Sequence, residues 1–407
     1  MEINHKSFSS RSNLIWFFLV ITLLFSVSTI RYEHFAAKRH FGDFHVYYVT
    51  GERLRAGESI YVDDSEKLTP YKYSPLVASF FAILSIFPEA VAASVWHWLN
   101  LFFLMGSALL SLRLAKDHQV EEPLISKREI VLGSIGILGV SPVILHCLNS
   151  GQVGLSILYF FLLGAFFANQ EKENLSAFFF ALSAMFKYLP ILVAPYLWLS
   201  GRRRLSMLLA LWFVLFHFIP ALWLGWARNL VFLKGFLPFL TSTTLDHVSL
   251  LDFKNQSMWA YLYRLIFYDL GYFAIREHPG QLAIVGTILF LIFYGMVVFS
   301  GKIGRVTKGR AFVIDCALLV ILIFNPNAWK HNFVLLLFPY LILVSKVSQA
   351  KWRGPELFAL LLTSALVFFS KRDFIGWDLR FELMSASVLL LASLSLFTVL
   401  LISKRTD

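Results

Sequence analysis

Residues 41–75 read FGDFHVYYVTGERLRAGESIYVDDSEKLTPYKYSP and form the only long polar interval in the first half of a very apolar chain. The interval is too long for a hairpin between two membrane helices, and irregular segments of this length are usually functional or disordered. Its aromatic and aliphatic residues argue against disorder. We therefore expect a folded loop that lies on a membrane surface and carries polar side chains, among them Asp43, His45, Tyr47, Lys72 and Tyr73.

The composition indicates a bilayer as the solvent of this protein. Apolar and aromatic residues make up 58% of 407 residues and charged residues only 15%, against about 25% charged residues in soluble domains. The net charge of +11 could suggest a nucleic-acid partner. However, the basic residues gather in short loops between apolar runs, as membrane topology requires, so we expect no nucleic acid. Cys147 and Cys316 lie in apolar runs and give neither a disulfide framework nor a metal-binding pattern.

The apolar runs predict an all-α polytopic membrane protein of about twelve transmembrane helices, forming a single domain over residues 1–407. About 20 apolar residues cross a bilayer. The first run is long for a signal peptide and lacks a clean cleavage site, so we expect it to be retained. Three runs are short, which leaves the helix count uncertain by two. The runs cover residues 13–30, 74–87, 91–112, 129–147, 152–169, 175–199, 206–225, 281–300, 311–324, 331–345, 355–370 and 381–402.

The distribution of Lys and Arg predicts that both termini are cytoplasmic. The predicted inside loops are basic with almost no acids, and they include Arg202, Arg203 and Arg204. The predicted outside segments are mixed in sign and include residues 113–128 and 371–380. External loops at about 31–73 and 226–280, with the turn at 325–332, would then meet round one external cavity. The same count places the NSGQVG segment, residues 149–154, near the cytoplasmic face, unless a half-height helix precedes it.

Two ionisable residues stand out. Asp43 follows the first apolar run and has bulky apolar neighbours. It is either a solvated or helix-capping acid or a partly desolvated general base. Lys187 lies well inside the run 175–199 and is too central to reach an interface easily, although snorkelling is the alternative. A charge at this depth is a functional hypothesis by default, and Tyr188 and Pro190 predict a break that faces a polar cavity. We expect Lys187 to bind an anion such as a lipid phosphate.

Other polar residues are weaker candidates. Gln152 follows Asn149 and Gly151 in an interruption between two apolar runs, where a plain loop is the alternative. His331 follows Trp329 in NPNAWKHNF, and a histidine at a helix start is structural or else binds phosphate or a proton. Asn255, Gln256 and Arg264 lie in an amphipathic stretch that is an interfacial helix in the alternative interpretation. No P-loop, dinucleotide-binding, nucleophile-elbow or HExxH motif is present.

An ordered set of short motifs resembles glycosyltransferase family 87, a family of GT-C-type membrane mannosyltransferases that use polyprenyl-phosphate mannose. The resemblance implies a GT-C-type bundle with its active site in external loops near the membrane surface. The family's essential acid matches Asp43, its later histidine matches His331, and its lysine before proline matches Lys187. Here Tyr188 and Leu189 separate that lysine from Pro190, and Asn332 stands where family members often carry a second histidine. The motifs are DFHVYY at 43–48, LRAGESIY at 54–61, YKYSPL at 71–76, GQVG at 151–154, MFKYLP at 185–190, RRR at 202–204, NQS at 255–257 and NPNAWKHNF at 325–333.

These residues support one mechanistic hypothesis. Asp43 accepts the proton of an acceptor hydroxyl that attacks the anomeric carbon of a polyprenyl-phosphate sugar, with His331 as the alternative base or a phosphate ligand. The lipid phosphate leaves as a stable anion and needs nearby positive charge, which Lys187, Arg264 and Lys72 would supply. A single displacement inverts the anomeric centre, so the β-linked donor that the resemblance implies would give an α product. The remaining substrate-binding candidates are His45, Tyr47, Tyr73, Gln152, Asn255, Gln256 and Trp329.

The expected partners are the lipid-linked donor, a glycan or glycolipid acceptor, and membrane lipids. We expect no cofactor, and the chemistry requires no metal ion. In a bacterium the protein would lie in the inner membrane with its site facing the periplasm. Two other classes remain open from the sequence: a lipid-linked glycan ligase or polymerase, which would use a diphosphate donor, and a polytopic transporter, which would favour internal inverted repeats.

Overall fold

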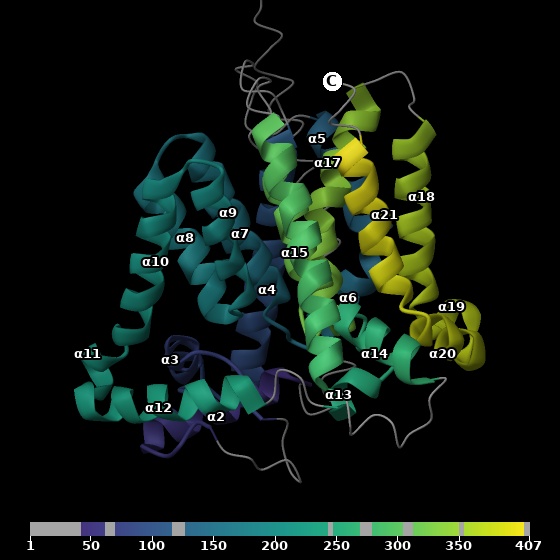
Figure 1. The fold of residues 1–407 in the computed structure, drawn as a ribbon. Helices are drawn as coiled ribbons and strands as arrows, with labels where there is room; N and C mark the ends of the chain where they lie inside the picture. The colour runs from purple at the N-terminus through teal and green to yellow at the C-terminus, as the bar shows by residue number, and fades with distance from the viewer. Residues whose placement is uncertain are drawn as a thin grey trace, which may run out of the picture.

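A computed structural model describes residues 42–61, 70–115, 127–242, 247–268, 279–303, 312–349 and 354–402. All regular elements in these ranges are helices, and the longer ones stand side by side in a bundle (Figure 1). The long helices are α4 (Glu89–Ala115), α5 (Lys127–Gly139), α7 (Gly154–Asn169), α8 (Glu173–Phe186), α10 (Arg203–Phe218), α15 (Pro279–Ile303), α16 (Phe312–Ile323), α17 (Leu337–Gln349), α18 (Gly354–Phe369) and α21 (Val388–Ile402).

The helices that do not run along the bundle gather at one end of it, which we call the α2 end (Figure 1). The opposite end carries Arg202, Arg203 and Arg204 between α9 (Val193–Leu199) and α10, and we call it the arginine end. Helix α21, which ends at Ile402, also runs toward the arginine end (Figure 1). The helices of the α2 end are α2 (Phe44–Ala56), α3 (Pro75–Leu84), α11 (Ala221–Leu224), α12 (Trp226–Ser242), α13 (His247–Leu251), α14 (Met258–Tyr268), α19 (Arg372–Ile375) and α20 (Trp377–Ser385).

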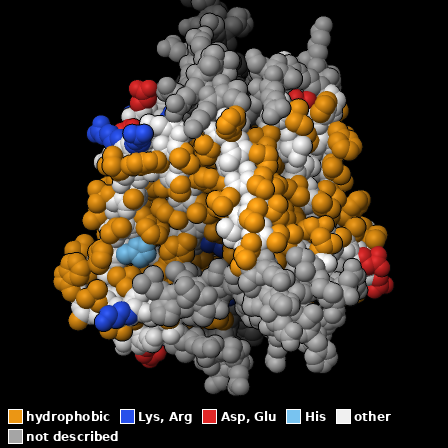
Figure 2. Space-filling model, viewed as in Figure 1, with side chains coloured by type: hydrophobic (Ala, Val, Ile, Leu, Met, Phe, Trp, Pro, Cys, Tyr) orange, Lys and Arg blue, Asp and Glu red, His pale blue; other side chains and the backbone are white. Residues whose placement is uncertain are grey.

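The outer surface of the bundle is apolar, as expected of an integral membrane protein. Figure 2 shows hydrophobic side chains covering the sides of the long helices between the two ends. Four described helices are long and apolar enough to cross a membrane, and the number rises to six if each of two bent helix pairs counts as one span. The predicted twelve spans are therefore not confirmed, and the first predicted span, residues 13–30, lies outside the described residues.

The predicted span at 74–87 is wrong. Its helix, α3, has only 10 residues and starts where the Ser74 hydroxyl accepts a hydrogen bond from the Val77 N–H. At 1.5 Å per residue it is about half the thickness of a hydrocarbon core. The chain therefore leaves α3 at the α2 end, and α4 runs from there to the arginine end. Arg113 at the end of α4 contacts Glu129 of α5 at 3.7 Å, at the arginine end of the bundle (Figure 1). The prediction that residues 113–128 lie on the side opposite Arg202 is therefore wrong for the described residues 113–115 and 127–128.

A bend between α5 and α6 (Ser141–Asn149) moves the NSGQVG segment to the α2 end. The two helices meet at 75°, and Pro142 stands in the first turn of α6, where a proline needs no hydrogen-bond partner. The backbone N–H of Asp43 donates to the Ser150 carbonyl at 3.0 Å. Residues 149–154 thus lie beside Asp43, and the prediction that placed them near the opposite face is wrong.

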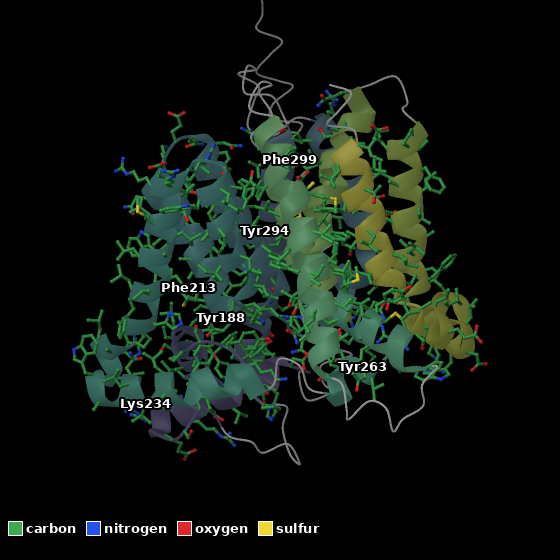
Figure 3. All side chains as sticks on the ribbon, in the orientation of Figure 1. Tyr188, Phe213, Lys234, Tyr263, Tyr294 and Phe299 are labelled. Carbon is green, nitrogen blue, oxygen red and sulfur yellow. The ribbon has the colours of Figure 1, made fainter. Side chains whose placement is uncertain are left out.

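The run 175–199 is not a single span, because the chain reverses at Lys187. Lys187 is extended (φ −163°, ψ 128°) and ends α8, and Pro190 opens the 3₁₀ helix η1 (Leu189–Leu192) that leads into α9. Glu173 at the start of α8 lies 3.4 Å from Arg204, so the run begins and ends at the arginine end. The predicted break at Tyr188 and Pro190 is therefore present, and Tyr188 packs against Phe213 of α10 (Figure 3).

Candidate active site

Asp43 stands at the start of α2, and an amide side chain holds its carboxylate. The Gln152 Nε2 donates to Asp43 Oδ2 at 2.6 Å. The carboxylate makes no capping bond to the first turn of α2, so the helix-cap alternative for this acid does not hold. Helix α2 is itself fixed by its buried face, where Tyr47 stacks on Phe81 of α3 with ring centroids 4.7 Å apart.

Two tyrosines set the orientation of the Gln152 amide. The Tyr47 hydroxyl donates to Gln152 Oε1 at 2.9 Å, and the Tyr73 hydroxyl lies 3.4 Å from the same oxygen. The two hydroxyls are 2.9 Å apart and hydrogen-bond to each other. Because the amide oxygen accepts from a phenol, the amide nitrogen faces Asp43. Four predicted site residues from three separate segments therefore form one hydrogen-bonded group, which we call the Asp43 group.

The environment of Asp43 suits a proton acceptor. Burial raises the pKa of the Asp43 carboxyl above its usual value, and the hydrogen bond from Gln152 offsets part of that shift. A carboxylate with a raised pKa binds a proton more readily, which is what a general base requires. Burial also raises the pKa of the Tyr47 and Tyr73 hydroxyls, so both remain protonated donors at neutral pH.

Gly151 makes the turn beside Asp43 possible. Its φ is +64°, and a Cβ at this position would lie 2.7 Å from Cβ of Phe44. Side-chain residues rarely adopt this φ, and the contact with Phe44 cannot relax without moving α2. The Trp96 Nε1 fixes the same turn by donating to the Gly151 carbonyl at 2.7 Å.

We expect Gly151→Ala to lower the free energy of unfolding by about 1–3 kcal/mol and to impair activity, because it strains the backbone and pushes α2 away from Gln152. Gly57→Ala is the matched control. Gly57 also has a positive φ, of +86°, but its nearest neighbour would be the flexible end of the Arg228 side chain. Thermal unfolding and activity of the two purified variants test this, and equal effects of both substitutions would contradict the role given to the Phe44 contact.

A second group of predicted residues surrounds Lys187. The Lys187 Nζ donates to Asn332 Oδ1 at 2.8 Å, and the Asn332 amide in turn donates to the Asn327 carbonyl at 2.7 Å. The charge of Lys72 also acts on Lys187. No carboxylate of the described residues lies within 4 Å of the Lys187 ammonium. Lys187 thus has a neutral amide oxygen as its hydrogen-bond partner and no carboxylate among the described residues. We call Lys187, Asn332 and Lys72 the Lys187 group.

His331 lies beside the Lys187 group. The charge of Lys187 acts on His331, and the His331 ring stacks on His146 of α6 with centroids 6.3 Å apart. A small cavity of about 20 Å³ borders Lys187 and Asn332, which is room for about one water molecule. Its other walls are mostly apolar: Gly154, Ile157, Leu189, Pro190, Ile321, Leu322, Asn325 and Leu335.

Residues 149–154 connect the two groups. Gln152 holds Asp43, and two residues later Gly154 packs so closely on η4 (Lys330–Leu336) that a Cβ there would lie 3.1 Å from the His331 carbonyl oxygen. The segment is thus in direct contact with both the acid and the histidine. This places the half-buried Asp43 carboxylate and the Lys187 group at the same end of the bundle.

Three other predicted residues support the loops of the α2 end. The Arg264 guanidinium donates to the Asp252 and Asn255 carbonyls and to the Ser387 hydroxyl, at 2.6–3.1 Å. Burial lowers its pKa to about 10, so it stays charged at neutral pH. Asn255 donates to the Pro326 carbonyl and Gln256 to the Met384 carbonyl. These bonds join the turn before α14 to the segment before η4 and to α20. Arg264, Asn255 and Gln256 therefore support the loops of this end, and their phosphate-binding and substrate-binding roles stay predictions.

His45 and Trp329 also lie outside the two groups. The His45 ring pairs with Glu89 at 2.6 Å and ties α2 to the start of α4. Trp329 precedes η4 and is half-buried. His146 was not among the residues predicted from the sequence, where its only distinguishing feature is that it stands alone in an apolar run. Asn332 was given no role. Within the described ranges, no three His, Cys, Asp or Glu residues come close enough to hold a metal ion.

The helical bundle with its apolar outer surface indicates an integral membrane protein, and the half-buried Asp43 and the Lys187 group lie at one end of it. The family model of glycosyltransferase family 87 matches residues 71–326, more than half of the chain, and the chain belongs to this family. The protein is thus a glycosyltransferase. The match includes Tyr73, Gln152 and Lys187, whereas Asp43 and His331 lie outside it. No curated protein and no solved structure matches the chain.

Proposed function

We propose that the protein transfers a hexosyl residue, mannose, from a polyprenyl-phosphate sugar to a hydroxyl group of a glycan or glycolipid on the non-cytoplasmic side of the membrane. The observation that carries the proposal is the 149–154 turn, which contacts both the half-buried Asp43 carboxylate and the backbone of His331, beside the Lys187 group. Family membership supports sugar transfer and argues against the transporter alternative. The polyprenyl-phosphate donor, the mannose and the acceptor belong to the proposal.

Asp43 acts as the general base. The acceptor oxygen attacks the anomeric carbon, the bond from that carbon to the phosphate oxygen breaks, and the hydroxyl proton passes to Asp43. Gln152 occupies only Asp43 Oδ2, so Oδ1 is available for the proton. The raised pKa of Asp43 favours this transfer. His331 remains the alternative base.

Lys187 and Lys72 stabilise the departing lipid phosphate. A phosphate leaves as a stable anion and needs fixed positive charge more than it needs a proton. In the structure the Lys187 ammonium is bonded to the neutral oxygen of Asn332, and a phosphate oxygen would compete for the same donor with a full charge. Two lysines suit a monophosphate better than the diphosphate of a ligase donor.

The donor's sugar needs more space than the structure offers beside Lys187. A cavity of about 20 Å³ is far too small for a hexose. The cavity walls come from α7, η1, α16 and η4, and η1 is a single 3₁₀ turn beside the extended Lys187. We infer that donor entry from the bilayer displaces η1 or η4 and widens the cavity.

The positive-inside rule gives the orientation. Arg202, Arg203 and Arg204 lie at the end opposite α2 (Figure 1), and short loops rich in arginine stay in the cytoplasm. The Asp43 and Lys187 groups would then face the periplasm or exterior in a bacterial inner membrane. This agrees with the use of a lipid-linked donor, which carries sugar to the side that nucleotide sugars do not reach.

The stereochemistry of the product tests the proposed mechanism. A single displacement with Asp43 as base inverts the anomeric carbon, so a β-linked polyprenyl-phosphate mannose should give an α-linked product. The purified protein in nanodiscs would be supplied with this donor and a mannose oligosaccharide acceptor, and the anomeric proton of the product would be assigned by NMR. A β-linked product would mean a double displacement and would contradict the role of Asp43 as a base.

A further inference from the structure

A cationic group outside the proposed active site occupies the α2 end between η4, α19 and α20. The Lys330 Nζ and the Arg380 Nε both donate to the Ser370 carbonyl oxygen, at 3.0 and 3.2 Å. Arg372 and Arg380 each place their guanidinium over the indole ring of Trp377, at 5.6 and 5.5 Å from its centroid. Three basic side chains thus converge on one carbonyl oxygen and one indole ring, and we call Lys330, Arg372 and Arg380 the basic cluster.

Within the described part of the chain, no acidic side chain lies within 4 Å of the three basic groups of the cluster, although the charge of Asp373 acts favourably on Lys330. Asp373 pairs with Lys371 at 3.3 Å. Neither Asp378 nor Glu382 of α20 forms an ion pair with a described residue within 4 Å. The charge of Arg380 acts unfavourably on Lys330, as expected for like charges held close together. A bound anion would relieve this repulsion.

The surroundings of the cluster indicate that the anion belongs to a lipid. Helix α18 exposes Phe358, Leu361 and Phe369 along one side and ends directly before Ser370. The α19–α20 segment exposes a further set of large apolar side chains: Phe374 (57% exposed), Trp377, Leu379 and Phe381. Arginine and tryptophan beside exposed apolar side chains, at the end of a lipid-facing helix, are typical of the headgroup level of a membrane. The cluster therefore lies where lipid phosphates lie.

We propose that the basic cluster binds the phosphate of an anionic membrane phospholipid, at a site separate from the proposed donor site. A zwitterionic phospholipid is a poorer ligand because its own cation is repelled by the positive charges of the basic cluster. Lys330 directly precedes His331 in η4, so the bound headgroup also holds the segment that carries this histidine. The lipid thereby supports the active site without taking part in transfer, and its binding can be measured whether or not the proposed reaction is correct.

Native mass spectrometry of the full-length protein tests this in mixed micelles with equal amounts of phosphatidylglycerol and phosphatidylcholine. Each basic residue near an anionic lipid contributes about fivefold, so the wild-type protein should retain phosphatidylglycerol with a roughly 100-fold preference at this site. Arg372→Gln/Arg380→Gln should reduce the preference to roughly fivefold. If this double variant does not fold, each single variant should lower the preference roughly fivefold.

The matched control is Arg204→Gln/Lys234→Gln, which removes the same charge elsewhere. Arg204 lies at the arginine end and Lys234 on α12 at the α2 end (Figure 3), and this variant should keep the wild-type preference. Arg372→Lys/Arg380→Lys retains the charge and should also keep it. The proposal is overturned if the wild type does not distinguish the two lipids, if the Arg→Gln variants keep the preference, or if millimolar inorganic phosphate displaces the phosphatidylglycerol.

Discussion

Asp43→Asn is expected to reduce sugar transfer by about 10²–10⁴-fold while leaving the protein folded, because asparagine keeps the size of the side chain but accepts no proton. Burial raises the pKa of Asp43 in the folded state, so the ionised carboxylate costs folding free energy at pH 7. This cost is absent below the unfolded-state pKa, grows as the pH rises from the unfolded-state to the folded-state pKa, and is constant above both. The neutral variant should therefore unfold at the same temperature as the wild type or higher. Transfer assays and thermal unfolding of both proteins measure the two effects, and near-normal transfer would remove Asp43 as the base.

The pH profile separates a base from a merely structural acid. As the pH is lowered, the transfer rate should begin to fall at a pH above the usual aspartate pKa of about 3.9, because the active carboxylate has a raised pKa. We call this fall the acidic limb of the pH profile. Gln152→Leu removes the hydrogen bond that lowers this pKa. The acidic limb of this variant should therefore shift to higher pH. A structural role for Gln152 would lower the rate at every pH without moving the limb.

Lys187→Met is expected to lower kcat/KM for the lipid donor by about 10²-fold or more, because it removes a buried charge that faces the departing phosphate. Methionine fills a similar volume, and the ammonium has no carboxylate partner among the described residues. The substitution therefore leaves no buried acid unpaired there, although Asn332 Oδ1 loses its donor. The transfer rate measured at varied donor concentration gives kcat/KM for both proteins. Only monodisperse protein is used for this comparison.

Two further variants define what Lys187 does. Lys187→Arg keeps the charge and should retain more transfer than Lys187→Met. Asn332→Leu removes the neutral partner of Lys187 and, if the ammonium serves the phosphate, should affect donor kinetics less than Lys187→Met. An unchanged apparent donor affinity in Lys187→Met would exclude Lys187 from the phosphate site.

The membrane class was predictable from the sequence, but the path of the chain was not. Apolar runs predicted the long helices α4, α10 and α15, because a span must be apolar over about 20 residues. A hydropathy count cannot distinguish a full span from α3, which stops after 10 residues, or from a run such as 175–199 that reverses at Lys187. A hydropathy count also cannot detect the 75° bend between α5 and α6. Each such element changes the side on which the following loop is predicted to lie.

Most individual site residues could be predicted from the sequence, but their arrangement in space could not. Asp43, Gln152, Tyr47 and Tyr73 were all candidates, but their hydrogen bonds join segments as far apart as residues 43 and 152. Lys187 stood out because it interrupts an apolar run, whereas the role of Asn332 depends on which face of η4 meets α8. Arg264 has the same sequence feature as Lys187, a cation among apolar residues, yet its two terminal nitrogens donate to loop carbonyls and to the Ser387 hydroxyl. Only the folded backbone separates these two cases.

The most direct test of the account is a comparison of two donors with one purified protein. Wild type and Asp43→Asn in nanodiscs would each receive radiolabelled polyprenyl-phosphate mannose or a nucleotide-activated mannose, with a mannose oligosaccharide as acceptor. We predict transfer from the lipid-linked donor by the wild type, loss of this transfer in Asp43→Asn, and no transfer from the nucleotide sugar. Transfer from the nucleotide sugar, or equal transfer by both proteins from the lipid donor, would contradict the account.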